Sequence, residues 1–393
     1  MCEETIRQKS AKELAAELVR FDSVSSKSNS EVTQTVSGWL DQLGFQIEWL
    51  EYKDSQGTTK VSIVAKREPK AGVKGPEGNA TGGGAYLAHT DVVPVDDWDT
   101  GFSGPFEPIE REGRLYGRGS CDMKGSLACA IQAVSRIDRN QQIKPLYFVV
   151  TADEEIGMEG AYRVDKQSKL FQEMIDSRVT GIIGEPTEMK VVVAHKGTWE
   201  VVLRANGTSA HTSTGAGRNA NYQLIPALAP LLALRERTET SPEFQNKDFD
   251  PPTLSWNMVI RNEPLALNVT TAIAEVPIFL RTMPGVDVAP IMDEIRRVQQ
   301  AHGLEWIEKR SNPFWRVEPK SAWVEDMLKI TGTEKPHSVC YGTDASQLQR
   351  LERLVICGPG SIDQAHRKDE WVAIEQLERA VHVFEQAFRK WAC

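Results

Sequence analysis

Seven acidic or imidazole side chains lie in five short motifs that together suit metal-dependent hydrolysis. The motifs are AHTD with His89 and Asp91, GSCDMKG with Asp122, TADEEIG with Glu154 and Glu155, GEPT with Glu185, and GPGSIDQAH with His366. Carboxylate and imidazole groups are ligands that suit zinc, cobalt and manganese. Each motif is weak alone, but the five together indicate one charged pocket that holds two metal ions.

Four of these motifs follow or end an apolar run that predicts a β-strand. The runs are AYLAHTDVV, PLYFVVTADEE, GIIGEPT and LVICGPG. Ligands of α/β sheets bind beyond the carboxyl ends of the strands, so we expect these side chains to meet. Asp122 instead lies where a helix is expected to begin, near Met123. Its two oxygens could bridge two metals, or the residue could simply cap the helix.

Neighbouring acids in these motifs are expected to have different roles. His89 and Asp91 are two residues apart in an expected strand and so share a face. Asp91 could bind a metal directly, but we favour it as the acceptor of the second imidazole N–H of His89. Glu154 and Glu155 are adjacent, so one is expected to bind metal and the other to hold a proton. A solvated loop is the alternative for these acids, although their position after a buried strand makes it the weaker reading.

The length of the chain indicates two domains, and the distribution of its charges excludes one class of partner. The chain has 393 residues, of which 40% are hydrophobic and 26% charged, with a net charge of -9. Lys and Arg form no runs, so we expect no nucleic-acid partner. The six cysteines are widely spaced and indicate free thiols in a reducing compartment.

The amino terminus and the apolar runs predict a cytoplasmic protein with no membrane segment. The start, MCEETIRQKS, is acidic where a signal peptide would be basic, and no apolar core follows it. No run approaches the roughly 18 apolar residues that a membrane helix requires.

The pattern of elements predicts an α/β fold in which a second domain is inserted. Helical spacing is present at residues 8–21 and 31–43, where Gly44 ends the second helix. Residues 67–84 contain six glycines and two prolines and are expected to form a mobile loop between two strands. From about 196 to 310 the order strand, helix, strand, strand, helix predicts an α+β insert. We therefore expect a catalytic domain formed by residues 1–195 and 311–393, because the first four ligand motifs precede the insert and the fifth follows it.

In this order, the five motifs resemble the dinuclear-zinc aminoacylase family of amidohydrolases. That family includes acetylornithine deacetylase, succinyl-diaminopimelate desuccinylase, aminoacylases and a glutamate carboxypeptidase. The resemblance covers nearly the whole chain, and TADEE, AHKG and GPGSIDQAH are most similar to acetylornithine deacetylase. It implies a catalytic domain with a mixed central sheet flanked by helices, and an inserted α+β domain that serves as lid and dimerisation domain.

The resemblance also implies a role for each matching residue. His89 and Glu185 would hold one zinc ion, Glu155 and His366 the other, and Asp122 would bridge them, with cobalt able to substitute. Glu154 would be the general acid/base, and Asp91 would orient His89. In the insert, His211 in GTSAHTSTGAGRNA would reach the active site of the partner in a homodimer and stabilise the oxyanion.

Two further positions of the insert, Asn268 and Arg281, match those that would face the substrate, with Arg281 able to pair with a carboxylate. Before Asn268, however, this chain has VIRNEPLALN where the family is often glycine-rich, which weakens the assignment of substrate contacts there. Asp344 in GTDA occupies a position that has an acid in relatives, without a role that the sequence defines.

The implied activity is hydrolysis of the amide bond of an N-acyl-L-amino acid, with N2-acetyl-L-ornithine as the foremost substrate, in arginine synthesis. A desuccinylase, a general aminoacylase or a dipeptidase on the same scaffold is the nearest alternative. A non-catalytic metal-binding homologue is a weaker one, because every ligand and Glu154 are present. A serine hydrolase is disfavoured because GxSxG is absent, and a nucleotide-binding protein because no Gly-Lys pair of a Walker loop occurs.

Overall fold

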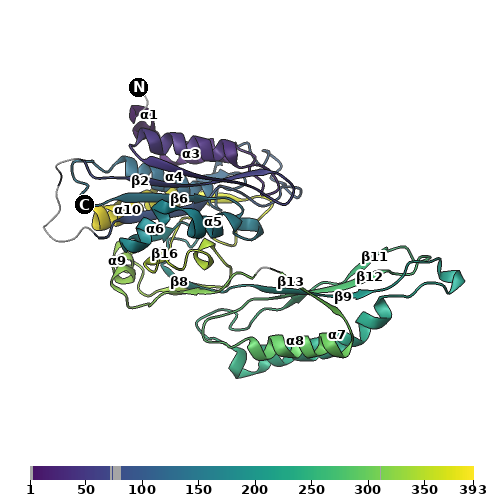
Figure 1. The fold of residues 1–393 in the computed structure, drawn as a ribbon. Helices are drawn as coiled ribbons and strands as arrows, with labels where there is room; N and C mark the ends of the chain where they lie inside the picture. The colour runs from purple at the N-terminus through teal and green to yellow at the C-terminus, as the bar shows by residue number, and fades with distance from the viewer. Residues whose placement is uncertain (1–2, 71–72, 74–80, 310) are drawn as a thin grey trace. The chain divides into compact units, whose positions relative to one another are not determined.

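A computed structural model describes residues 3–70, 73, 81–309 and 311–393. The chain divides into two compact units, which Figure 1 shows as ribbons. Unit 1 consists of Met1–Val193, Val317–His337 and Thr343–Cys393, and unit 2 of Ala194–Arg316 and Ser338–Gly342. The expected insert at 196–310 thus falls within unit 2, which extends a few residues beyond it. Half of the expected loop at 67–84, namely 71–72 and 74–80, lies outside the described residues.

The main sheet of unit 1 runs in the order β1-β2-β6-β3-β7-β16-β8. Its strands are β1 (Gln46–Lys53), β2 (Thr59–Arg67), β3 (Gly84–His89), β6 (Leu146–Thr151), β7 (Thr180–Ile183), β8 (Val192–His195) and β16 (Leu354–Ile356). At one end of the sheet, β8 continues into unit 2, where His195 pairs with Trp315 of β14 (Trp315–Arg316). The short strand β15 (His337–Val339) also pairs with β8. A separate small sheet contains β4 (Ile109–Arg111), β5 (Arg114–Tyr116) and β17 (Trp371–Ala373).

Helices cover both faces of the main sheet (Figure 1). One face carries α2 (Ala11–Val19), α3 (Ser30–Gln42), α4 (Lys124–Ser135) and α10 (Ile374–Ala392), and the other carries α5 (Glu159–Gln167) and α6 (Lys169–Asp176). Adjacent residues of β6 show this division, because successive strand side chains point to opposite faces. Phe148 packs against Phe388 of α10, whereas the Tyr147 hydroxyl donates to Glu173 of α6. Unit 1 also contains α1 (Glu3–Gln8), α9 (Ala322–Thr331) and the 3-10 turns η1 (Glu154–Ile156) and η4 (Asp344–Ser346).

Four parallel strands in the centre of the sheet bring distant motifs to one edge. Every residue of β3 and β6 is buried, as expected for strands covered on both faces. β3 pairs in parallel with β6 and β7, and β7 pairs in parallel with β16. Their carboxyl ends therefore lie along one edge, and the acidic and imidazole motifs follow directly.

Unit 2 is an antiparallel sheet with two helices on one face. Its sheet contains β9 (Trp199–Asn206), β10 (Asn257–Met258), β11 (Arg261–Glu263), β12 (Ile273–Leu280) and β13 (Glu305–Glu308). The helices α7 (Asn221–Thr240) and α8 (Ala289–Ala301) cover a core of alternating apolar residues such as Val201 and Ile278. The unit also has 3-10 turns at η2 (Thr212–Thr214) and η3 (Pro242–Phe244).

For this region the sequence predicts the order strand, helix, strand, strand, helix, and the structure adds two strands, β11 and β13. The second expected strand, TLSWNMVI at residues 253–260, is also shorter than its apolar run indicates. Only β10 is extended and paired there, because Ser255 has a φ of 52° and interrupts the strand. Among the described residues, no helix is long and apolar enough to cross a membrane.

Candidate metal centre

His89 is the last residue of β3, and its imidazole is 1% exposed. Its Nδ1 lies 2.9 Å from the backbone oxygen of Asp91, a geometry in which Nδ1–H donates and Nε2 is left to face the acids. Nε2 lies 3.1 Å from Asp122 Oδ1 and 4.0 Å from Glu185 Oε1. Burial alone would lower the pKa of His89, but the carboxylates of Asp122 and Glu185 raise it well above its usual range. The same carboxylates that favour the protonated imidazole would also favour a metal cation, which would replace the proton on Nε2.

Asp122 lies between two imidazoles, just before α4. Its Oδ1 is 3.1 Å from His89 Nε2 and its Oδ2 is 3.5 Å from His366 Nε2. Burial would raise the pKa of Asp122, but hydrogen bonds with both histidines lower it well below its usual range. The carboxylate therefore stays charged and presents one oxygen to each side, as a bridging ligand would. Capping α4 is not its role, because Met123 is the N-cap residue and makes no side-chain cap.

His366 and Glu155 form the second side of the cluster. His366 Nε2 lies 3.0 Å from Glu155 Oε2, and its side chain is 51% exposed. Hydrogen bonds with Asp122 and Glu155 raise the pKa of His366 to about 10. Burial, assisted by the charge of Asp122, raises the pKa of Glu155 to about 7. The imidazole and the acid, which are 211 residues apart in the chain, thus meet at one position.

Glu185 follows β7 and is 4% exposed. The residue before it, Gly184, must lack a side chain, because a Cβ there would lie 1.9 Å from the Tyr86 hydroxyl. Burial, and then the charge of Asp122, raise the pKa of Glu185 well above its usual range. This acid contributes negative charge on the His89 side of the cluster.

The donor set fits a metal site. Ligand atoms of His89, Asp122 and Glu155 all lie within 4.8 Å of one another. Several buried acids here have raised pKa values, which means that their charges lack sufficient neutralisation from protein groups. Divalent cations would supply that neutralisation, and imidazole with carboxylate is a donor set that suits zinc or cobalt.

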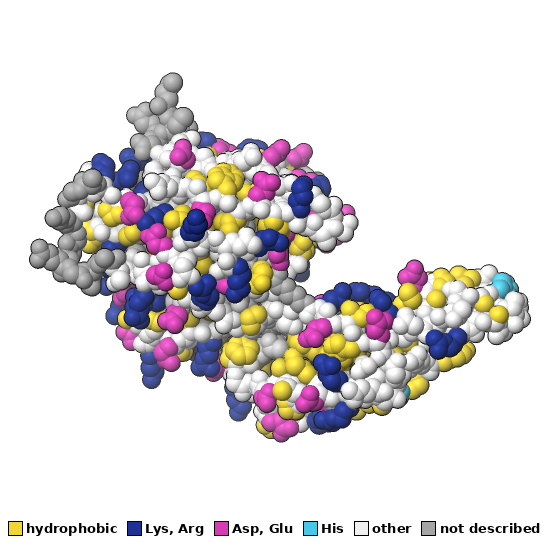
Figure 2. Space-filling view, viewed as in Figure 1, with side chains coloured by type: hydrophobic (Ala, Val, Ile, Leu, Met, Phe, Trp, Pro, Cys, Tyr) yellow, Lys and Arg dark blue, Asp and Glu magenta, His cyan; other side chains and the backbone are white. Residues whose placement is uncertain are grey.

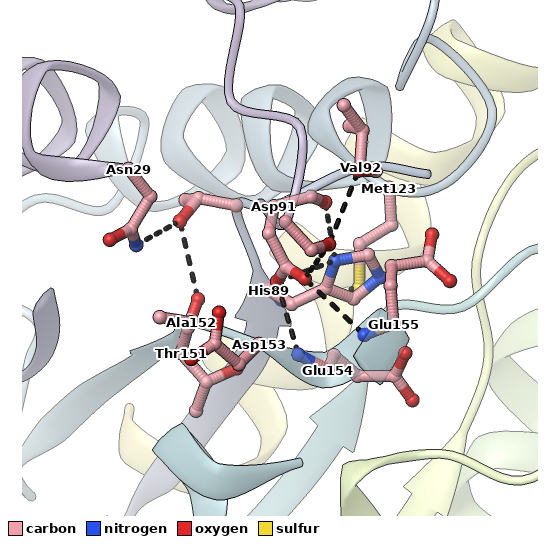
Figure 3. Close-up of polar contacts among 12 residues, drawn as sticks. Asn29, His89, Asp91, Val92, Met123, Thr151, Ala152, Asp153, Glu154 and Glu155 are labelled. Carbon is pink, nitrogen blue, oxygen red and sulfur yellow. Dashed lines mark hydrogen bonds and ion pairs between the residues drawn. The ribbon is translucent and has the colours of Figure 1, made fainter. Parts of the chain in front are cut away.

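Asp91 holds the backbone of the two neighbouring glutamates. Its Oδ1 accepts from the Glu154 N–H at 3.1 Å, and its Oδ2 accepts from the Glu155 N–H at 3.3 Å and from the Ser25 hydroxyl at 2.7 Å (Figure 3). Its carboxylate is 3.6 Å from His89 Nδ1, farther than its own carbonyl oxygen. Because β3 ends at His89, Asp91 lies beyond the strand in which it was expected. It contacts the imidazole through its backbone and frees its carboxylate to fix Glu154 and Glu155.

The three consecutive acids separate into different environments because β6 ends at Thr151 and a turn follows. The expectation that these acids belong to the strand is therefore wrong, and η1 begins at Glu154. Asp153 has a φ of 59°. Its carboxylate forms an ion pair with buried Lys60 at 2.8 Å and accepts from the Tyr52 hydroxyl at 2.7 Å. Asp153 thus anchors the turn, while the neighbouring Glu154 is 9% exposed.

The residues expected to contact substrate lie in unit 2. His211 forms a β-bridge with Val269, and the Thr212 N–H donates to the Asn268 oxygen at 3.0 Å, which brings His211 and Asn268 together. The His211 and Asn268 side chains are exposed. Arg281 follows β12, and its guanidinium lies 5.2 Å from the Phe279 ring.

Several supporting residues were not found from the sequence, namely Ser25, Tyr52, Lys60, Arg118 and Glu370. Their partners are far away in the chain, and a single polar residue in an ordinary context gives no local signal. Asp344, whose role the sequence leaves open, is 4% exposed and accepts from the Thr151 hydroxyl at 2.5 Å. Burial raises its pKa to about 6.

Comparison with known proteins shows the family of the chain. A model of the peptidase family M20/M25/M40 matches residues 85–390. The chain belongs to this family. Acetylornithine deacetylase of Proteus mirabilis is 31% identical over 367 residues, which cover 91% of this chain and 89% of that protein. The enzyme of the same name from Vibrio campbellii is 28% identical, over 93% of this chain and 92% of its own.

Solved structures share the fold. An M20 family metallo-carboxypeptidase from Sulfolobus solfataricus has a TM-score of 0.74 at 16% identity, covering 97% of this chain and 99% of its own. A dinuclear metal-binding M20 peptidase from Bacillus subtilis has a TM-score of 0.64 at 14% identity, covering 98% of each chain. The predicted family, the fold class and the assignment as a hydrolase are therefore confirmed.

Without metal, we expect the folded protein to lose stability as the pH rises from about 6 to about 8. The folded-state pKa is raised to about 7 for Glu155 and to about 10 for His366, so the folded protein holds more protons than the unfolded chain in this range. Stability then decreases with rising pH. Thermal unfolding in chelator at three pH values measures the slope. The double variant Glu155→Gln/His366→Asn should have a flatter slope, and identical slopes would contradict the assignment.

Proposed function

We propose that this protein hydrolyses the amide bond of an N-acyl-L-amino acid, with N2-acetyl-L-ornithine as substrate and L-ornithine and acetate as products, in arginine synthesis. One observation carries the proposal: the Asp122 carboxylate lies between His89 and His366, each of which faces a further acid. The choice of substrate is supported by 31% identity to acetylornithine deacetylase over 91% of the chain.

We assign the ligands of two zinc ions, for which cobalt can substitute. His89 and Glu185 would hold one ion, Glu155 and His366 would hold the other, and Asp122 would offer one carboxylate oxygen to each. When bound, the two ions would lower the pKa of a water molecule and polarise the acyl carbonyl. The contacts of Asp122 with both imidazoles support the bridge, and the raised pKa values of Glu155 and Glu185 support the need for cations.

Glu154 is assigned as the general acid/base. Burial, together with the charges of Glu185 and Asp344, raises its pKa well above its usual range, so its carboxylate is a stronger base than an exposed one. It takes a proton from the attacking water as the new C–O bond forms. The same proton then passes to the amide nitrogen as the C–N bond breaks, which releases acetate and the free amine. Asp91 holds the Glu154 backbone during both transfers.

Three residues of unit 2 are assigned to the substrate. His211 donates a hydrogen bond to the carbonyl oxygen as it becomes negative. Arg281 pairs with the α-carboxylate of the amino acid, and Asn268 contacts the substrate beside His211. The backbone contacts between the His211 and Asn268 segments support a shared role for these two.

We further propose a homodimer formed through unit 2, in which His211 serves the partner's active site. The outer face of α7 is unusually apolar, with Tyr222, Ile225 and Leu232 exposed by 78%, 57% and 48%. Leu265 and Leu267, in the segment before Asn268, are exposed by 81% and 99%. Hydrophobic side chains are visible on the surface of unit 2 in Figure 2. Large exposed apolar areas mark interaction surfaces.

A cytoplasmic location is part of this proposal. The five cysteines among the described residues are all free thiols, in keeping with a reducing compartment.

Substrate turnover tests the proposal. We expect purified protein with zinc or cobalt to hydrolyse N2-acetyl-L-ornithine with a kcat/KM at least about tenfold above that for N-succinyl-diaminopimelate, N-acetyl-L-methionine or a dipeptide. N2-acetyl-D-ornithine is the control for stereochemistry. A dipeptide or another acyl amino acid as the best substrate would contradict the substrate assignment, and no hydrolysis of any of them by metal-loaded protein would contradict the function.

Glu154→Gln should reduce kcat by about 10²–10⁴-fold while bound metal stays at the wild-type level, because only the proton acceptor is lost. Asp122→Asn should lose metal as well as turnover. Metal content by atomic emission and steady-state kinetics measure the two effects. Glu378→Gln, an equal charge change at an exposed position of α10, is the control. Near-normal turnover of metal-loaded Glu154→Gln would exclude Glu154 as the acid/base.

Ile225→Asp/Leu232→Asp should yield a monomer with strongly reduced turnover, because a charged α7 face prevents association and removes the partner's His211. Light scattering and kinetics on the same sample measure both properties. Gln300→Asp, at an exposed position of α8, should leave the dimer and its turnover intact. A fully active monomer, whether wild type or variant, would remove His211 from the mechanism.

A further inference from the structure

A buried ion pair joins the Asp122 loop to the segment that follows His366. Arg118 Nη1 lies 2.7 Å from Glu370 Oε2, and each side chain is 1% exposed. Arg118 is also fixed by a hydrogen bond from Nη2 to the Pro94 oxygen at 3.3 Å. Buried ion pairs are costly to desolvate and are often no more stabilising than apolar residues of similar volume. Stability therefore does not explain why an ion pair is buried at this position.

The second carboxylate oxygen of Glu370 contacts the backbone of the Asp122 loop, which explains the position of the pair. Oε1 accepts from the Cys121 N–H at 2.8 Å and from the Asp122 N–H at 3.1 Å. Both bonds end on the peptide groups next to the residue that faces His89 and His366. The Asp122 backbone is thus tied to a charged acceptor that is itself held by Arg118.

Backbone pairing extends this connection to the other side of the cluster. The Gly117 N–H donates to the backbone carbonyl oxygen of Glu370 at 3.0 Å. Directly after Glu370, β17 pairs with β5 in antiparallel register, with Trp371 opposite Tyr116. His366 lies only four residues before Glu370 in the sequence. The same short segment therefore carries one histidine of the cluster and positions the carboxylate that faces it.

We infer that Glu370 is a positioning residue, which fixes the Asp122 carboxylate between the two imidazoles and keeps it in register with His366. This role rests on the proposed metal-dependent function. It assigns to Arg118 the task of keeping Glu370 charged and oriented. Residues that orient metal ligands in this way typically affect metal affinity by about 10–100-fold.

The test is cobalt binding in the absence of substrate, measured by competition with a chelating indicator and by the cobalt absorption spectrum. We expect Glu370→Ala to lower cobalt affinity by about 10–100-fold and to change the spectrum. Glu370→Gln should retain more of the wild-type affinity, because its amide oxygen can still accept from both N–H groups.

Arg118→Met/Glu370→Met separates positioning from stability, because it replaces the whole buried pair by apolar side chains. We expect it to melt near the wild-type temperature and still to bind cobalt about 10–100-fold more weakly. Arg67→Met is the control, since Arg67 is equally buried and pairs with Leu146 at the opposite end of β6 from the cluster. It should lower the melting temperature without altering cobalt affinity.

Wild-type cobalt affinity and an unchanged spectrum in Arg118→Met/Glu370→Met would overturn the inference and leave a purely structural ion pair. If Glu370→Ala does not fold, the cobalt affinities of the double variant and of Glu370→Gln decide whether Glu370 positions Asp122. Failure of the wild-type protein to bind cobalt would instead overturn the proposed function and, with it, the site that Glu370 positions. The two failures are therefore distinguishable in one set of titrations.

Discussion

Concentrated negative charge in a buried volume is the constraint on which the rest of unit 1 depends. Three parallel strands, β3, β6 and β7, end at one edge, where His89, Glu154, Glu155 and Glu185 lie, while Asp122 precedes the start of α4. Burial raises the pKa of three of these acids, so the protein alone does not neutralise the cluster. A fold that tolerates this arrangement must gain the missing positive charge elsewhere, and bound cations are the direct source.

The supporting residues are explained by the same constraint. Backbone N–H groups and buried cations hold the acids in place without neutralising the cluster centre. The Asp91 carboxylate accepts hydrogen bonds from the N–H groups of Glu154 and Glu155, and Lys60 forms an ion pair with Asp153 in the same turn. These contacts involve the backbone of Glu154 and Glu155 and the side chain of Asp153, so the side chains of the proposed ligands are not used by them.

Much of this arrangement could be predicted from the sequence. Apolar runs such as LYFVV and GII predict buried strands, and acids directly after them predict a charged edge; both features are local. The short β10 could not be predicted in the same way, because the left-handed backbone at Ser255 has no clear residue signal. The role of Asp91 was predicted only in part: its contact with His89 runs through the backbone, since β3 ends two residues earlier. Glu370 was missed because its three partners lie about 250 residues away in the chain.

The two-metal site is tested most directly by locating metal in crystals grown with zinc, from anomalous differences at the zinc absorption edge. We expect two peaks in unit 1, one contacted by His89 and Glu185, the other by Glu155 and His366, with an Asp122 oxygen on each. A single peak, or peaks that Asp122 does not contact, would contradict the central claim that this carboxylate joins two metal sites.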